Sequence, residues 1–196
     1  MSDNSYSANF PYASPLAVYD PETLKQNPLD SEARSADGKS LVNPPTGKLS
    51  TVYDEFPEGF VKTNNGFDFH IYYMPGNPDE ALFAKELHER IRREFPELRI
   101  YRFWDKAIGP HPTAMFEVNV FTPHQTGAFF SWLALNRGPL SVLIHPNTSD
   151  PLKDHTELAT WMGRPWPLNI TPLSMALRGT GAHAAAAAPG AASGAN

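Results

Sequence analysis

The chain has 196 residues, of which 41% are hydrophobic and 20 are prolines, and it carries a formal net charge of −5 and no cysteine. The lack of cysteine excludes disulfides, thiolate nucleophiles and zinc sites with Cys ligands. The acidic balance, without a dense Lys/Arg block, disfavours a nucleic-acid surface, and no segment approaches the roughly 18 apolar residues of a membrane span.

Both ends of the chain are predicted to lie outside the ordered domain. Residues 1–65 contain many prolines, and residues 30–48 have almost no large apolar side chain, which predicts an irregular N-terminal arm. Met1–Phe10 lacks the basic start and apolar run of a signal peptide, so we expect a cytoplasmic protein. Residues 171–196 are rich in Ala and Gly and are predicted to form a flexible tail.

The ordered part begins with a strand and a long helix. Phe67–Met74 is predicted to be a strand with one buried face, because its apolar and polar residues alternate. Asn77 and Pro78, followed by two acidic residues, indicate the start of a helix. Apolar residues then recur at every fourth position, which predicts a helix with one apolar stripe that ends near Pro96.

The remaining pattern continues this alternation of strands and helices. It predicts strands at 99–106, 114–122 and 140–145, a helix at 126–137 and a short helix at 154–161. Gly138 is well placed to end the longer helix. Asp154 is expected to cap the short helix, with Gly163 as its stop.

The resulting order of elements is strand, helix, strand, strand, helix, strand. It predicts an α+β fold of the ferredoxin-like class over residues 66–170, with a four-stranded antiparallel sheet, two helices on one face and an extra short C-terminal helix. The other face of the sheet is expected to stay open. Its polar residues are Asp68, His70, Tyr72, Glu117, Asn119, Ser141 and His145.

Two alternative metal sites are compatible with this face. In the usual strand order of this fold, His70 lies between the strands of His145 and Glu117, which gives the two-histidine, one-carboxylate pattern that suits non-haem Fe(II). His111, held between two prolines, offers instead a three-nitrogen site with His70 and His145, which zinc and iron both accept. Strand register decides between the two, and a sequence does not fix register.

His155 is expected to serve as a further ligand or as an acid/base group that titrates near neutral pH. The simpler interpretation is that each histidine is a hydrogen-bonded structural residue and that Glu117 is a solvated carboxylate. The sequence contains no HExxH motif, phosphate-binding loop or GxSxG motif. The residues alone therefore predict an α+β domain with a histidine-rich candidate metal site.

Three stretches taken together resemble a known family. They are FDFHIYYMP at 67–75, GPHP at 109–112 followed by MFEVNV, and WLALNRGPLSVLIHPNTSDPLKDHTELATWMG at 132–163. They resemble the fungal and bacterial DOPA 4,5-dioxygenase family across the whole predicted core and none of the tails. The most specific part is LSVLIHPNT followed by DHTELATWMG.

The resemblance implies an extradiol ring-cleaving dioxygenase on a ferredoxin-like scaffold. Such an enzyme uses non-haem Fe(II), for which zinc can substitute in a crystal, and O₂ to open a catechol such as L-DOPA, giving a seco-DOPA that can cyclise to betalamic acid. The motif histidines carried over are His70, His111, His145 and His155. We expect the first three to bind the metal.

The remaining roles are expectations within that reaction. His155 is the expected catalytic base, with Glu117 as the second choice, and Tyr72 and Asn119 are expected to bind substrate. The expected partners are a small catechol and O₂, without nucleic acid or membrane. Two alternatives stay open: a zinc-dependent hydrolase, and a non-enzymatic ligand-binding domain or homodimer that pairs the open sheet faces of two copies.

Overall fold

The computed structural model of the protein describes residues 11–29, 32–43 and 47–179. The chain divides into two compact units, 1–49 and 50–196. In the first unit, the short helices η1 (Pro15–Val18) and α1 (Pro21–Gln26) contain no buried residue. This unit therefore lacks a core of its own in its described part, and the rest of the fold belongs to the second unit.

The first strand of the second unit, β1 (Phe67–Tyr72), has the two faces predicted from its alternation. Phe69 and Ile71 belong to the main hydrophobic core. His70 and Tyr72 project from the opposite face, because successive side chains of a strand alternate in direction. The helix after it, α2 (Pro78–Glu94), confirms the prediction, since the side chain of Asn77 accepts hydrogen bonds from the N–H groups of Asp79 and Glu80.

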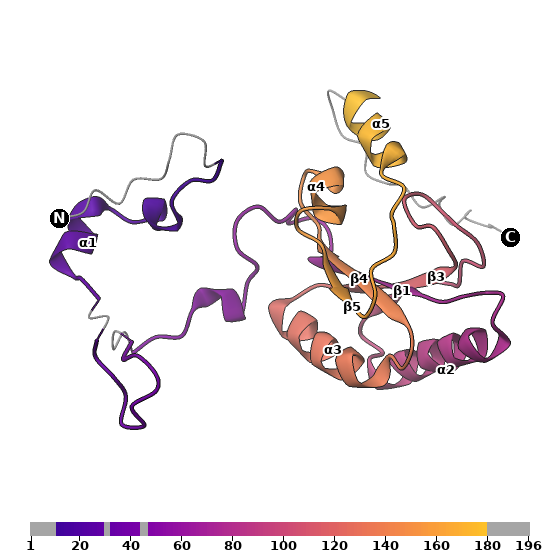
Figure 1. The fold of residues 1–196 in the computed structure, drawn as a ribbon, viewed down its shortest axis with the longest axis horizontal. Helices are drawn as coiled ribbons and strands as arrows, with labels where there is room; N and C mark the ends of the chain where they lie inside the picture. Colours follow the sequence, from indigo (N-terminus) through magenta and orange to yellow (C-terminus); the bar gives the residue numbers. More distant parts are fainter. Residues whose placement is uncertain (1–10, 30–31, 44–46, 180–196) are drawn as a thin grey trace, which may run out of the picture. The chain divides into compact units, whose positions relative to one another are not determined.

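The second long helix, α3 (Pro123–Asn136), starts three residues before its predicted position. Thr122 caps it through the N–H of Gln125, and Pro123 occupies the first turn, where it costs no hydrogen bond. After the helix, Gly138 has a φ of +55° and faces the ring of Phe83 on α2, so a side chain there would be both strained and crowded. Helices α2 and α3 cover one face of the sheet (Figure 1).

The sheet has five antiparallel strands, in the order β2-β3-β1-β4-β5, whereas four were predicted. The remaining strands are β2 (Arg99–Ile100), β3 (Met115–Val120), β4 (Ser141–Pro146) and β5 (Thr160–Met162). As expected, β1 lies between β3 and β4. Strand β2 is much shorter than the predicted 99–106, and beyond it only Trp104 forms a bridge to β3.

The predicted short helix at 154–161 ends at His155, a turn follows, and the fifth strand takes its last two positions. The helix α4 (Pro151–His155) starts earlier, capped by Asp150 rather than by Asp154. Asp154 is instead buried, and both of its carboxylate oxygens accept hydrogen bonds from Thr148. The β-branched and aromatic residues that follow pair with β4, so their capacity to form a strand prevailed over the helix-capping pattern.

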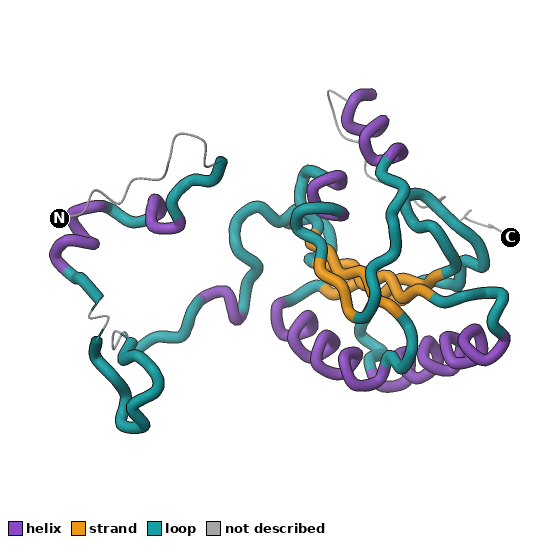
Figure 2. Tube along the Cα trace, viewed as in Figure 1, coloured by secondary structure: helices purple, strands orange, loops and turns teal. Residues whose placement is uncertain are grey.

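The sheet face opposite α2 and α3 is partly covered, contrary to the prediction of an open face. Helices α4 and α5 (Thr171–Gly179) lie on that side (Figure 1), and loops rise on the same side (Figure 2). A second apolar cluster of Tyr72, Met115 and Leu143, with three tryptophans packed against it, forms there. Helix α5 occupies the start of the predicted tail, and residues 180–196 lie outside the described part.

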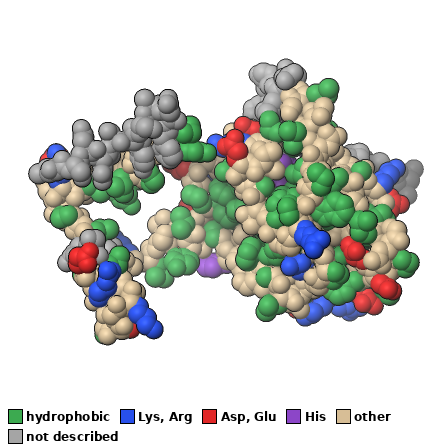
Figure 3. Space-filling model, viewed as in Figure 1, with side chains coloured by type: hydrophobic (Ala, Val, Ile, Leu, Met, Phe, Trp, Pro, Cys, Tyr) green, Lys and Arg blue, Asp and Glu red, His purple; other side chains and the backbone are tan. Residues whose placement is uncertain are grey.

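The surface of the second unit mixes charge types. On the face shown in Figure 3, Lys and Arg side chains are interspersed with acidic and hydrophobic ones, and few histidine atoms are visible. Among the described residues, no helix combines the length and the apolar composition needed to cross a bilayer.

Candidate metal centre

Four histidines from separate elements meet on the partly covered face of the sheet. His70 lies on β1, His145 near the end of β4, His111 in the loop before β3, and His155 at the end of α4. The ring centroids of His70 and His111 are 4.2 Å apart, those of His70 and His145 5.1 Å, and those of His145 and His155 4.0 Å. The structure therefore brings together the four histidines that the sequence singled out, and their roles stay predictions.

Strand register explains the placement of the two strand histidines. Asp68 pairs with His145 across β1 and β4, and His70 pairs with Glu117 across β1 and β3. Directly paired residues of antiparallel strands point to the same face. The four side chains therefore share one face, with the two carboxylates beside the two imidazoles.

The other two histidines reach the same point through tight local structure. His111 closes a small turn with Ile108, in which Gly109 has a φ of +56° that favours glycine. His155 ends α4, whose start is fixed by Asp150. The turn at 108–111 and helix α4, which are far apart in the sequence, thus bring two more histidines to the sheet.

Hydrogen bonds on the outer ring nitrogens orient three of the four imidazoles. The Nδ1 of His145 lies 2.8 Å from the carbonyl oxygen of Pro146, and the Nδ1 of His155 lies 2.8 Å from that of Pro151. Because a carbonyl only accepts, each Nδ1 carries a proton, and a neutral ring then has a lone pair on Nε2. The Nδ1 of His111 lies 2.6 Å from the hydroxyl of Tyr72, which can donate or accept, so this hydrogen bond orients the ring without fixing its proton.

His70 is the residue at the centre of the cluster. Its Nε2 lies 3.0 Å from the Nε2 of His145, while its Nδ1 is buried, has no hydrogen-bond partner among the described residues and lies 3.8 Å from Oε2 of Glu117. Two nitrogens that each stand about 2.1 Å from one cation, at right angles, are separated by about 3.0 Å. The pair therefore fits two ligands of one metal, with the proton of His70 on Nδ1 facing the carboxylate of Glu117.

The environment keeps these histidines neutral. Burial lowers the pKa of His111 and of His145 to about 3, with a further contribution from the nearby His155. Burial, followed by the three neighbouring histidines, places the pKa of His70 well below its ordinary value, and burial also lowers that of His155. Neutral imidazole is the form that binds metal ions, so the cluster is ready for a cation near neutral pH.

Two overlapping ligand sets have their donor atoms within 4.8 Å of one another. One contains His70, His111 and His155, and the other contains Asp68, His70 and His145. The carboxylate in the second set is Asp68, which the sequence analysis placed on this face without assigning it a role. The predicted strand order, which places β1 beside β4, could have pointed to Asp68, because in the observed register Asp68 pairs with His145.

The two carboxylates beside the histidines are bridged by one amide. Asn119 Nδ2 donates to Oδ1 of Asp68 and, at 2.7 Å, to Oε1 of Glu117. Burial raises the pKa of Asp68 to about 6 and that of Glu117 to about 7, and Asp68 adds to the shift of Glu117. The amide of Asn119 thereby holds Asp68 and Glu117 in place. Asn119 was also predicted to bind substrate, and that role stays a prediction.

Tyr72, also predicted to bind substrate, is 1% exposed, and its hydroxyl is hydrogen-bonded to His111. Its ring stacks on Trp161 at a centroid distance of 5.6 Å, and Trp166 lies at 6.5 Å. Burial raises its pKa, so the hydroxyl stays protonated. The contacts of Tyr72 are therefore those of a residue that positions His111.

Replacing Tyr72 with Phe tests this role. The ring and its packing remain, while the hydrogen bond to His111 is lost, so we expect metal affinity to fall by about 10-fold or more. Titration of metal-free protein with a divalent cation measures the change. Tyr101→Phe, which removes a hydroxyl outside the cluster, is the matched control, and an affinity equal to wild type in Tyr72→Phe would contradict the role.

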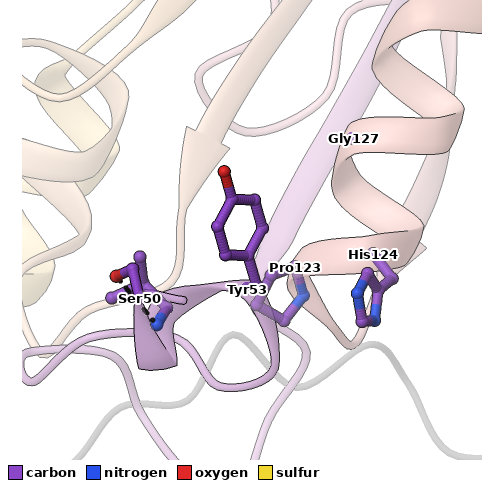
Figure 4. Close-up of a pocket in the computed structure, with 6 residues that line it drawn as sticks. Ser50, Tyr53, Pro123, His124 and Gly127 are labelled. Atoms are coloured by element: carbon purple, nitrogen blue, oxygen red, sulfur yellow. Dashed lines mark hydrogen bonds between the residues drawn. The ribbon is translucent and has the colours of Figure 1, made fainter. Parts of the chain in front are cut away.

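A separate hollow lies between η2 (Thr51–Tyr53) and the start of α3, as Figure 4 shows. It is wide open and is lined by Ser50, Val52, Tyr53, Pro123, His124 and Gly127. The one ionisable side chain among these, apart from the tyrosine, is the exposed His124, 4.0 Å from Asp54. The hollow lacks the converging donor atoms of the histidine cluster, so the cluster is the candidate site.

Fold and site together define an α+β protein whose antiparallel sheet carries a buried histidine cluster suited to a divalent metal. The chain matches the model of the Dopa 4,5-dioxygenase family over residues 67–172. A 21.2 kDa uncharacterized protein of Botryotinia fuckeliana is 52% identical over 182 residues, which cover 89% of this chain and 97% of that protein.

Two further similarities carry functional names. The DOPA 4,5-dioxygenase of Amanita muscaria is 38% identical over 141 residues, which cover 68% of this chain and 58% of that enzyme. A crystal structure from Nostoc punctiforme, described as a candidate dioxygenase, is 36% identical, has a TM-score of 0.52 and covers 57% of this chain and 93% of its own. The chain belongs to the Dopa 4,5-dioxygenase family, and the predicted resemblance is confirmed.

Proposed function

We propose that the protein is an Fe(II)-dependent extradiol dioxygenase that opens the ring of a catechol such as L-DOPA with O₂. The single observation that carries the proposal is the buried cluster of four neutral histidines with two adjacent carboxylates, in a chain of the Dopa 4,5-dioxygenase family. We assign strands β1–β4 with helices α2 and α3 to the ferredoxin-like class, with β5 as an added edge strand. The proposed location is cytoplasmic.

The residues of the cluster fit the metal. Nitrogen and carboxylate donors with no thiolate suit Fe(II), and His70 with either Asp68 and His145 or His111 and His155 would hold it. When bound, Fe(II) would supply Lewis acidity and would pass electrons from the catechol to O₂, so that no other reductant is needed. In the overall reaction both oxygen atoms enter the product, while the ring C–C bond beside the diol breaks.

The chain's own residues supply proton handling and shape. His155 is less buried than His70 or His145, and its Nδ1–H is fixed on Pro151, so its Nε2 is free to accept a proton from a catechol hydroxyl. Glu117 is held by Asn119 against His70, which suits it to stabilising a proton on the Nδ1 of His70. The tryptophans around Tyr72 form an apolar side to the cluster that keeps water away.

The decisive experiment compares metals in protein purified without air. Protein loaded with Fe(II), mixed with L-DOPA and then with O₂, is expected to consume one O₂ per DOPA and to form a yellow product. Protein loaded with Zn(II) is expected to do neither. Turnover with Zn(II) alone would overturn the proposal in favour of a zinc hydrolase, and colour with simpler catechols alone would change the substrate while keeping the reaction.

A further inference from the structure

Arg99 lies beside the metal centre and is so far unexplained. We propose that its guanidinium binds the carboxylate of the substrate's side chain, so that the site selects catechols that carry an amino-acid group. The inference rests on the proposed function for the catechol itself. It assigns a specificity-determining role to a residue that is not among the candidate ligands or bases.

The register of the sheet places Arg99 in line with the centre. Arg99 pairs with Asn119, Asn119 with Asp68, and Asp68 with His145, so all four side chains project from the face that carries the histidines. The backbones of Arg99 and Asp68 are separated by two strand spacings, about 10 Å. A catechol held at the histidines, with its side chain directed along the row of Asp68, Asn119 and Arg99, would reach the guanidinium.

Hydrogen bonds direct the guanidinium of Arg99 from β2 toward β1 and the metal centre. Nε donates to Oδ1 of Asn119 at 2.6 Å, and Nη2 donates to Oδ1 of Asn65, the residue just before Gly66 and β1, at 2.5 Å. Asn65 in turn donates to Asp68, whose Oδ2 is 3.9 Å from Nε2 of His145. One amide and one carboxylate thus separate the arginine head from the metal centre.

The same contacts make the guanidinium rigid. Its carbon lies 5.0 Å from the ring centroid of Phe121 and 5.7 Å from that of Tyr101, while Asn65 and Asn119 are 2% and 1% exposed. Arg99 is itself exposed, yet two buried amides and two rings hold its guanidinium in one position. Such pre-organisation lowers the entropic cost of binding a ligand.

The positive charge of Arg99 is not held in a direct ion pair. Among the described residues its guanidinium donates hydrogen bonds to neutral amide oxygens, while its charge partly offsets the rise in the pKa of Asp68 and of Glu117. A guanidinium has more N–H donors than these two bonds use, in the planar arrangement that matches a carboxylate. The neighbouring Asp68 and Glu117 disfavour a more highly charged anion such as a phosphate, which leaves a singly charged carboxylate as the fitting partner.

The test compares L-DOPA with dopamine, which has the same catechol and ammonium but lacks the carboxylate. In Arg99→Gln, kcat/KM for L-DOPA is expected to fall by about 10- to 100-fold, the usual value of a charge-assisted hydrogen bond. The value for dopamine should change by less than about threefold. Arg99→Lys should restore part of the loss for L-DOPA, and Arg102→Gln, at an exposed arginine, is the matched control.

A binding measurement separates this inference from the proposed reaction. Zn(II)-loaded protein without O₂ should bind L-DOPA more tightly than dopamine by calorimetry, and Arg99→Gln should remove the difference. Equal affinity of the wild type for both ligands, or equal losses for both in Arg99→Gln, would overturn the role of Arg99. Absence of catechol turnover combined with a selective binding loss would instead overturn the proposed reaction and keep the carboxylate site.

Discussion

His70→Ala is expected to abolish metal binding and catechol turnover. His70 is the one residue common to both candidate ligand sets, and its Nε2 faces that of His145 at 3.0 Å. Loss of a residue that merely positions a ligand lowers metal affinity by about 10- to 100-fold, so loss of a central ligand should exceed 100-fold. Metal content after dialysis, and affinity by titration, measure this effect without relying on activity.

The control for this variant is His124→Ala. His124 is exposed on α3 and belongs to neither ligand set. Its Nε2 lies 4.0 Å from a carboxylate oxygen of Asp54. It should bind metal and turn over substrate as the wild type does, while circular dichroism should show both variants folded. Metal bound by folded His70→Ala with wild-type affinity would mean that the cluster is a structural hydrogen-bonded group.

The third ligand can be determined by the same titration. His111→Ala and Asp68→Asn each remove a member of one candidate set and leave the other set complete. The sequence analysis left this choice between His111 and Glu117, and the structure places Asp68 rather than Glu117 in a ligand set. Asp68 lies two residues before His70 on β1. It pairs with His145 on β4, whereas Glu117 pairs with His70 on β3, and only the second of these pairings entered the predicted ligand set.

Much of the fold followed from local patterns whose physical cause is local. The alternation of β1 and the Asn77 cap of α2 depend on residues next to each other in sequence, and both predictions are confirmed. Strand β5 was missed because the capping pattern at Asp154 is equally local but loses to pairing with β4, a contact that no local pattern reports. Asp154 also accepts two hydrogen bonds from Thr148, a contact that the capping pattern does not report.

The site was predictable in its residue types and less so in its connections. Histidines at element ends suggested a shared centre, and they do meet. The hydrogen bond from Tyr72 to His111 and the network from Arg99 to Asp68 depend on side-chain reach across strands. Tyr72 and Asn119, which were expected to bind substrate, also contact members of the cluster, and their substrate role stays a prediction. Arg99 was not considered at all, and it lies where substrate selection is proposed.

Glu117→Gln is expected to change how stability depends on pH in the metal-free protein. Burial, followed by the charge of Asp68, raises the pKa of Glu117 from 4.5 to about 7. Between these two values the folded state binds more protons than the unfolded state, so the free energy of unfolding of the wild type falls as pH rises from 4.5 through 7. Gln cannot titrate, so this loss disappears in the variant.

The expected gain of the variant over the wild type, between pH 4.5 and pH 8, is therefore about 2–3.5 kcal/mol. The upper end corresponds to the 2.5-unit rise from 4.5 to about 7, at about 1.4 kcal/mol for each unit. The histidines are present in both proteins, so their own opposing loss of stability at low pH largely cancels in the difference. Urea unfolding in chelator at the two pH values measures it, with the exposed Glu97→Gln as control.

Adding the metal should reduce the stability advantage of Glu117→Gln at pH 8. A divalent cation at the histidines lowers the pKa of nearby carboxyl groups, so Glu117 ionises at lower pH and can accept a hydrogen bond from the Nδ1 of His70. The stability difference at pH 8 should then shrink, and Glu117→Gln should bind the metal more weakly than the wild type. If the two proteins lose stability in parallel from pH 4.5 to 8, Glu117 is an ordinary solvated carboxylate, and its place beside His70 has no electrostatic consequence.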